Sequence, residues 1–195
     1  MVKITQPSSS DVATHEVEYA YDVFNRRIAK SIDADSAGGG SAVGESYVYD
    51  GDAIVLAFDE SGSLTNRYLH GEQVDQILAD EDAVGEVLWA LADNLGSVRD
   101  LVESDGTVAN HITYDAYGAI TSESASTVDH LYAYTGRERD EESDLQFNRA
   151  RYYDAAIGQW ISEDPIGFAD SDPNVRRYVK NKTTISTDPS GVLGR

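Results

Sequence analysis

The chain contains no cysteine, one methionine and four prolines among its 195 residues. The absence of cysteine excludes disulfides, a cysteine nucleophile and thiolate zinc ligands, although it does not exclude export. No apolar run approaches the roughly 20 residues that a membrane-spanning helix needs, and residues 1–10 lack the apolar core of a signal peptide. The sequence therefore predicts a fold that rests on packing and backbone pairing, with no membrane span and no visible export signal.

Positive charge is also scarce, with 15 Lys and Arg against 35 Asp and Glu and a formal net charge of -20. A surface of this sign repels a phosphate backbone, so we expect no nucleic-acid partner. The arginine-rich run from Arg137 to Arg151 is a local exception. Acidic residues are interleaved with these arginines, which favours ion pairs within the chain.

Metal and cofactor motifs are missing as well. The four histidines, His15, His70, His111 and His130, are scattered without metal-ligand spacing. The acidic triplet 80–82 lacks the ligand spacing of a calcium loop, and the triple glycine 38–40 is not followed by the lysine and helix of a phosphate-binding loop. We therefore predict neither a metal nor a cofactor.

Tyrosine, in contrast, is abundant, with 12 residues that lie mostly in short apolar runs. Such runs are typical of β-strands. Residues 46–58 contain two of them around the Asp50-Gly51 dipeptide, which suits the positive φ angles of a tight hairpin turn. Comparable units of strand, turn, glycine and strand recur about every 20 residues up to residue 121, which predicts an all-β fold of successive antiparallel hairpins.

Four Tyr-Asp pairs accompany these hairpins. We expect the tyrosine ring to pack on the sheet and the carboxylate to accept backbone N–H groups of the following turn, which is a structural role. The pairs begin at Tyr21, Tyr49, Tyr114 and Tyr153.

Changes of composition divide the chain into four parts. Residues 1–17 are polar and expected to be disordered or frayed, 18–121 hold the hairpin repeats, 122–130 form a polar linker and 131–195 form a C-terminal domain. Little helix is expected, at most a turn or two near 172–179.

Several motifs together resemble the RHS/YD-repeat proteins and their C-terminal RHS repeat-associated core domain. They are the Tyr-Asp pairs, Leu91–Arg99, Tyr132–Glu138, Asn148–Asp154, Ile157–Gly167 and Asp188–Gly191. The resemblance implies a curved or spiral YD-repeat sheet that closes into a shell, with the core domain as its plug. It also implies a secreted or cell-surface location, and as partners further RHS repeats of a longer chain or a C-terminal effector protein.

The resemblance further implies a site. Many family members cut their own backbone after this last motif, using two aspartates of which one is protonated, and the matching residues here are Asp164 and Asp188. Arg177 or Arg176 is expected to hold one carboxylate ionised. The cleavage region would be Gly191, Val192 and Leu193, although the motif departs from the family pattern because Val192 stands where leucine is usual.

Three functions remain open from the sequence. The first is a structural shell or plug module, in which the core motif residues are buried and its arginines are paired. The second is the aspartate-dependent self-cleaving core, and the third is an adhesive surface that binds cell-surface carbohydrate through exposed rings such as Trp89 and Tyr117. The core motif residues are Arg149, Arg151, Tyr152, Tyr153, Asp154, Gly158, Trp160, Pro165 and Gly167.

Overall fold

The fold is all-β in the computed structural model, which describes residues 2–6, 15–33, 42–170 and 172–192. Within these ranges the chain forms strands and three short 3-10 turns, and no α-helix. The strands are β1 (Val2–Gln6), β2 (His15–Tyr21), β3 (Arg27–Asp33), β4 (Val43–Asp50), β5 (Ala53–Asp59), β6 (Leu64–His70), β7 (Ile77–Asp82), β8 (Val87–Ala92), β9 (Val98–Glu103), β10 (Val108–Tyr114), β11 (Ile120–Glu123), β12 (Glu138–Asp140), β13 (Leu145–Asn148), β14 (Arg151–Asp154) and β15 (Gln159–Trp160).

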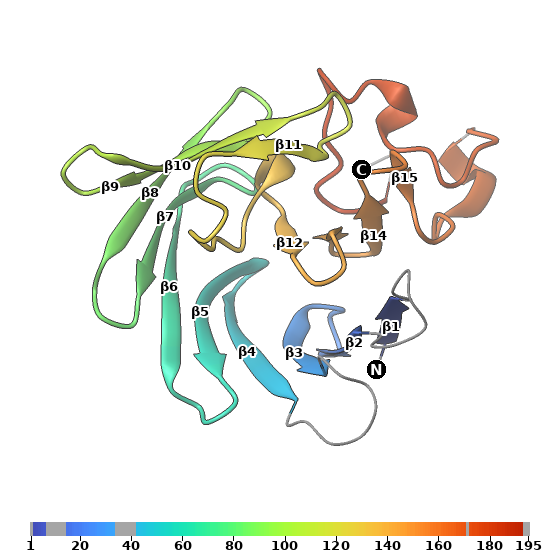
Figure 1. Cartoon of the computed structure of the whole chain (residues 1–195). Coiled ribbons are helices and arrows are strands. Elements are labelled where there is room, and N and C mark those ends of the chain that lie inside the picture. Colours follow the sequence, from blue (N-terminus) through green and yellow to red (C-terminus); the bar gives the residue numbers. More distant parts are fainter. Residues whose placement is uncertain (1, 7–14, 34–41, 171, 193–195) are drawn as a thin grey trace. The chain divides into compact units, whose positions relative to one another are not determined.

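The chain divides into two compact units. The first comprises Met1–Tyr68 with Asp82–Val84, and the second comprises Leu69–Glu81 with Gly85–Arg195. In the first unit each strand from β1 to β5 pairs antiparallel with the next strand in the chain. In the second unit β7 to β11 follow the same rule, as the green to yellow ribbons of Figure 1 show. The predicted succession of antiparallel hairpins is confirmed.

A five-residue turn with an aspartate at its first position connects many of these strands. In the turn from Asp59 to Ser63, the Asp59 N–H donates to the Ser63 carbonyl at 2.9 Å, and the Asp59 carboxylate accepts the N–H groups of Ser61 and Ser63, each at 2.9 Å. Gly62 occupies the fourth position with φ of 78°, in the left-handed region that a side chain disfavours. Asn25 takes the equivalent place in the turn after Tyr21-Asp22, with φ of 62°.

In three of the four Tyr-Asp pairs the aspartate acts in its turn as expected. Asp22 accepts the backbone N–H groups of the residues two and four positions ahead, at 2.8 and 3.0 Å. Asp115 repeats this contact at 2.7 and 3.0 Å, and Asp154 accepts two N–H groups of its own turn. The carboxylate therefore satisfies backbone donors that the tight turn leaves without a strand partner.

The second unit also contains a four-stranded antiparallel sheet, in the order β12-β13-β14-β15. An aromatic cluster lies against it: Tyr153 and Trp160 come from β14 and β15, and Tyr178 is fully buried between them, with its ring centroid 4.3 Å from that of Tyr153. Burial of such rings is the largest source of stability in a small β domain. The C-terminal segment is thus fixed to this small sheet.

The stretch expected to be frayed, residues 1–17, includes residues 7–14, which lie outside the described residues. In its described part, Val2–Gln6 pairs with β2 in regular antiparallel register and β2 begins at His15. The backbone hydrogen bonds of this pairing outweigh the polar composition. The little helix expected near 172–179 takes the form of 3-10 turns at Gly167–Asp170 and Val179–Asn181, and a third 3-10 turn lies at Tyr134–Gly136.

Candidate functional site

Asp164 and Asp188 meet at one arginine, although it is not the arginine expected from the sequence. The Arg151 Nη2 atom lies 2.8 Å from Asp164 Oδ2 and 3.7 Å from Asp188 Oδ2. All three side chains are at least 94% buried. The site is thus a pair of buried carboxylates that share a single positive charge.

Each aspartate also begins a turn of its own segment. Asp164 accepts the Ile166 N–H at 3.0 Å through Oδ1, which leaves Oδ2 directed at Arg151. Asp188 Oδ1 accepts the Ser190 hydroxyl at 3.0 Å and the Val192 N–H at 3.3 Å. The two Asp-Pro motifs therefore fold locally like ordinary aspartate turns, and only tertiary packing brings them together.

Arg151 is held from a second side by Trp160. Its guanidinium carbon lies 4.2 Å from the centroid of the indole ring, in cation-π contact. Burial lowers the pKa of Arg151 from its ordinary value, while the charges of Asp164 and Asp188 act in the opposite direction. An arginine remains a cation at physiological pH under such influences, so the site keeps its positive charge.

A second group of contacts fixes the segment that contains Asp188. Four consecutive residues donate hydrogen bonds to four consecutive carbonyl groups, and we call this arrangement the carbonyl clamp. Asn148 Nδ2 donates to the Asp188 carbonyl at 2.8 Å, Arg149 Nη1 to that of Pro189, the Ala150 N–H to that of Ser190 at 3.1 Å, and Arg151 Nε to that of Gly191. The donors belong to the turn between β13 and β14.

Gly191 is required by this close approach. A Cβ atom at this position would lie 2.3 Å from the Asn148 carbonyl oxygen and 3.0 Å from the Arg151 amide nitrogen. Its φ of 67° is also in the left-handed region. The glycine therefore allows the cleavage region predicted from the sequence to lie directly against the clamp.

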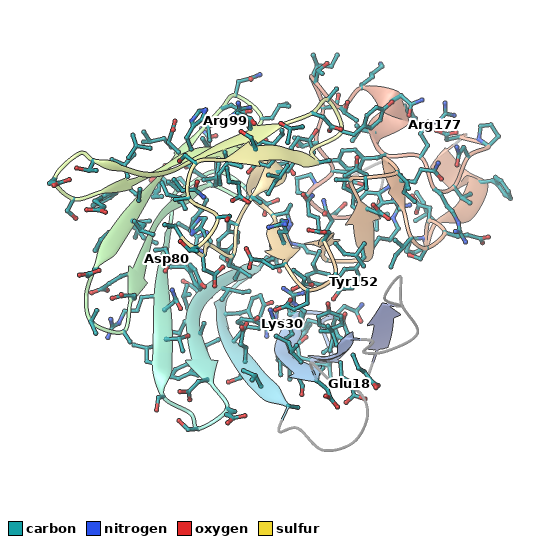
Figure 2. All side chains as sticks on the ribbon, in the orientation of Figure 1. Glu18, Lys30, Asp80, Arg99, Tyr152 and Arg177 are labelled. Atoms are coloured by element: carbon teal, nitrogen blue, oxygen red, sulfur yellow. The ribbon has the colours of Figure 1, made fainter. Side chains whose placement is uncertain are left out.

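Arg177 does not contact the aspartate pair. It binds Asp172 through two hydrogen bonds, at 2.5 and 3.1 Å, and its side chain is 31% exposed. Figure 2 labels Arg177 and, on β14, Tyr152, the neighbour of Arg151. The sequence contained both candidate arginines, but their spacing does not reveal which one folds toward Asp164. Asn148 and Ala150 were not identified as site residues from the sequence. Their contacts are made by a side-chain amide and a backbone N–H, which carry no charge and form no recognisable catalytic motif.

Most residues of the core motif are buried or make contacts within the second unit. Tyr152, Tyr153 and Trp160 are buried, and Asp154 caps the turn to β15. Both arginines are paired, Arg149 with Asp75 and Arg151 with Asp164. Gly158 and Gly167 have φ of 66° and 58°. Pro165 is exposed, contrary to the expected burial, because it lies in the solvent-facing turn that Asp164 begins.

The remaining predictions concern ligands and surfaces. The described residues include no cluster of three or more His, Cys, Asp or Glu side chains placed to bind a metal ion. No helix in the described part of the chain is long and apolar enough to cross a membrane. Trp89 and Tyr117 are 44% and 38% exposed. Leu193, the last residue of the predicted cleavage region, lies outside the described residues.

Comparison with known proteins finds a matching family model and several similar chains. The family model of the Teneurin YD-shell matches residues 7–183. A protein of Dickeya dadantii (strain 3937) described as probable deoxyribonuclease RhsB is 33% identical over an alignment of 182 residues that covers 90% of this chain and 12% of that protein. The tRNA nuclease WapA of Bacillus subtilis (strain 168) is 29% identical over 89% of this chain and 7% of its own length.

Solved structures agree on the fold. The crystal structure of TcdB2-TccC3-TEV matches 97% of this chain with a TM-score of 0.74 and 20% identity. The matched region is 10% of that chain. The present chain therefore spans only a small part of each of these proteins.

Proposed function

Because this chain belongs to the Teneurin YD-shell family, we propose that it forms part of the wall and plug of a larger YD shell and cuts its own backbone at the carbonyl clamp. The chain is a structural β-hairpin module of an RHS-type protein. The self-cleaving centre is supported by one observation above all, namely that Arg151 and Asp188 both contact the Gly191–Val192 peptide.

These contacts assign a role to each residue. Arg151 Nε donates to the Gly191 carbonyl oxygen, where negative charge develops when water adds to the carbonyl carbon. Asp164, paired with Arg151 Nη2, is the ionised carboxylate that takes the proton of the attacking water. Asp188, whose Oδ1 accepts the Val192 N–H, is the protonated partner that delivers a proton to this nitrogen.

The proposed reaction is a balanced hydrolysis. A bond forms between the water oxygen and the Gly191 carbonyl carbon, and the bond from that carbon to the Val192 nitrogen breaks. Asp188 Oδ1 is the atom that contacts the Val192 nitrogen, so the proton is delivered through this oxygen, and Asp164 takes a proton from the water in exchange. Two close carboxylates that share one cation favour such unequal protonation.

The test uses the chain extended beyond Arg195 by an inert tag of known mass. We expect the parent to lose the tag through a single cut between Gly191 and Val192, detected by intact mass spectrometry, and Asp164→Asn and Asp188→Asn to stay uncut. In water enriched in ¹⁸O, one heavy oxygen should enter the new carboxyl group of Gly191. Asp172→Asn is the matched control, because Asp172 also precedes a proline but pairs with Arg177.

An uncut parent that is folded would overturn the proposal, and so would cleavage in both asparagine variants. A cut between Val192 and Leu193 would retain the aspartate pair and reject the assignment of the bond. The control should be cut at the parent rate.

The partners follow from the family. We infer that the chain functions with further YD repeats and a C-terminal effector in a secreted or extracellular toxin protein, because its relatives are much longer chains with names such as probable deoxyribonuclease and tRNA nuclease. The exposure of Trp89 does not by itself identify a carbohydrate ligand, and the comparisons give a carbohydrate partner no support.

A further inference from the structure

We propose that Asp75, in the loop between β6 and β7, is a positioning residue for the cleavage site and acts through Arg149 on the carbonyl clamp. This inference rests on the proposed self-cleavage. It adds a residue that belongs to neither Asp-Pro motif and that lies far from both in the sequence.

The link is made by a single guanidinium group. Asp75 Oδ1 lies 2.7 Å from Arg149 Nη2, and Asp75 Oδ2 lies 3.3 Å from Arg149 Nη1. The same Nη1 atom donates to the Pro189 carbonyl. Because a carboxylate that contacts both nitrogens fixes the plane of the guanidinium, Asp75 determines where the donor to Pro189 points.

Asp75 also contacts Arg137, which binds the backbone next to Asn148, the first residue of the clamp. Its Oδ1 accepts a hydrogen bond from Arg137 Nη1 at 2.7 Å, and Arg137 Nε donates to the Phe147 carbonyl at 3.1 Å. Phe147 directly precedes Asn148, the first clamp residue. One carboxylate, only 6% exposed, thus connects two arginines that hold the clamp from both sides.

The loop itself is held close to the core domain. Asp75 has φ of 57°. Its carbonyl oxygen packs so closely on Gly136 that a Cβ atom at position 136 would lie only 2.1 Å from it. The Gly71 N–H closes the loop by donating to the Gln76 carbonyl at 2.8 Å. The loop therefore presents the Asp75 carboxylate in a fixed direction.

Packing alone does not fix the clamp on this side. A cavity of about 390 Å³ is lined by residues of both the loop and the last segment, among them Asp75, Thr135, Thr187 and Pro189. Where side chains do not interdigitate, position depends on directed polar contacts. Loss of the Asp75 charge should therefore release Arg149 and, with it, the carbonyl of the residue that follows Asp188.

The experiment compares Asp75→Asn with Asp144→Asn in the tagged chain. Asp144 is a control for the loss of an Asp–Arg pair alone, because it has φ of 55° and pairs at 2.7 Å with Arg139, which is not a clamp residue, although its side chain is 76% exposed. Cell-free synthesis with intact-mass sampling gives the cleavage rate. We expect Asp75→Asn to cut about tenfold more slowly or worse, since small displacements of reacting groups have effects of this size, and Asp144→Asn to keep the parent rate.

Two further measurements separate positioning from general stability. Arg149→Lys should slow cleavage as Asp75→Asn does, and the double variant should be no slower than either, because both changes break one linkage. Hydrogen exchange should accelerate more in the peptide 187–192 of Asp75→Asn than in the rest of the second unit, although loss of this buried carboxylate also lowers the urea midpoint below that of Asp144→Asn. Exchange that accelerates equally throughout the second unit would instead show a merely structural role and overturn the inference.

The outcomes also separate this inference from the proposed function. A cleaving parent with an equally fast Asp75→Asn would reject the role of Asp75 and leave self-cleavage intact. An uncut parent would reject self-cleavage. In that case the exchange of peptide 187–192 alone decides whether Asp75 holds the clamp.

Discussion

Asp59 in a hairpin turn and Asp188 in the C-terminal core are both turn aspartates, yet their surroundings differ in kind. The Asp59 carboxylate is solvated, and the hydrogen bonds that it accepts within the described part of the chain come from Ser61 and Ser63, within four positions of it. The Asp188 carboxyl group is 96% buried, and its segment is held by donors from a turn about 40 residues upstream. The hairpin region thus uses aspartate for local geometry, and the core uses it for tertiary assembly.

This difference predicts where substitutions have large effects. Water competes for every hydrogen bond of an exposed turn carboxylate. The net contribution of these bonds to the free energy of unfolding is therefore small. When a buried charge loses its partner, no water molecule can take the place of that partner. The loss of unfolding free energy is therefore large. The predictions below test this contrast from the largest expected effect to the smallest.

The largest effect is expected for Arg151→Gln. This change removes the only guanidinium that contacts both Asp164 and Asp188 in the described structure, and it leaves two carboxyl groups buried. Removal of one partner from a buried ion pair costs about 3–5 kcal/mol of unfolding free energy. Urea denaturation followed by tryptophan fluorescence measures it, because the probe Trp160 packs directly on Arg151.

Arg177→Gln is the matched control for this measurement. Arg177 also pairs with an Asp-Pro aspartate, Asp172, but its side chain is 31% exposed. Because water reaches the Arg177 guanidinium, we expect a smaller loss of stability than for Arg151→Gln. Equal losses for the two variants would contradict the contrast between buried and solvated pairs.

Gly191→Ala is expected to have the next largest effect. The new methyl group would meet the Asn148 carbonyl at 2.3 Å, and overpacking of this kind costs about 1–3 kcal/mol. The left-handed φ of 67° adds about 1–2 kcal/mol. Thermal unfolding gives the stability, and hydrogen exchange in peptide 187–192 should show that the clamp has opened.

Gly62→Ala sharpens this comparison. Gly62 has a similar φ of 78°, but nothing lies within 4 Å of the position of its Cβ atom. Only the backbone strain of about 1–2 kcal/mol should therefore appear. If Gly62→Ala lowered the free energy of unfolding as much as Gly191→Ala, the close approach of Gly191 to the clamp would make no measurable contribution to stability.

The same contrast explains what could be predicted from the sequence. The hairpins, the turn after Asp50 and the carboxylate role in the Tyr-Asp pairs follow from residues that are adjacent or nearly so, and such local chemistry is visible in a sequence. The meeting of Asp164 with Asp188 came from the resemblance to a family, since nothing in their spacing requires it.

The partners of these aspartates were not predictable in the same way. Arg151 and Arg177 are both arginines close to aromatic and acidic residues, and only packing on Trp160 selects Arg151. Asp75 has no motif at all, because its function depends on two arginines that the fold brings to it from the core domain. Long-range polar contacts of this kind depend on tertiary geometry, which periodicity does not encode.

The smallest effect is expected for Asp59→Asn, and it should appear only in acid. Hydrogen bonds from the Ser61 hydroxyl and then from the Ser63 N–H lower the pKa of Asp59 below its ordinary value of 3.8. A lowered pKa in the folded state stabilises the fold above pH 3.8, and this contribution is lost as the pH falls through the lowered pKa. Urea midpoints between pH 5 and pH 2 should therefore fall less for Asp59→Asn than for the parent. Ser61→Ala removes the first of these donors and keeps the backbone ones, so its profile should lie between the two; a profile identical to that of the parent would show that the backbone donors alone determine the acid response of the turn.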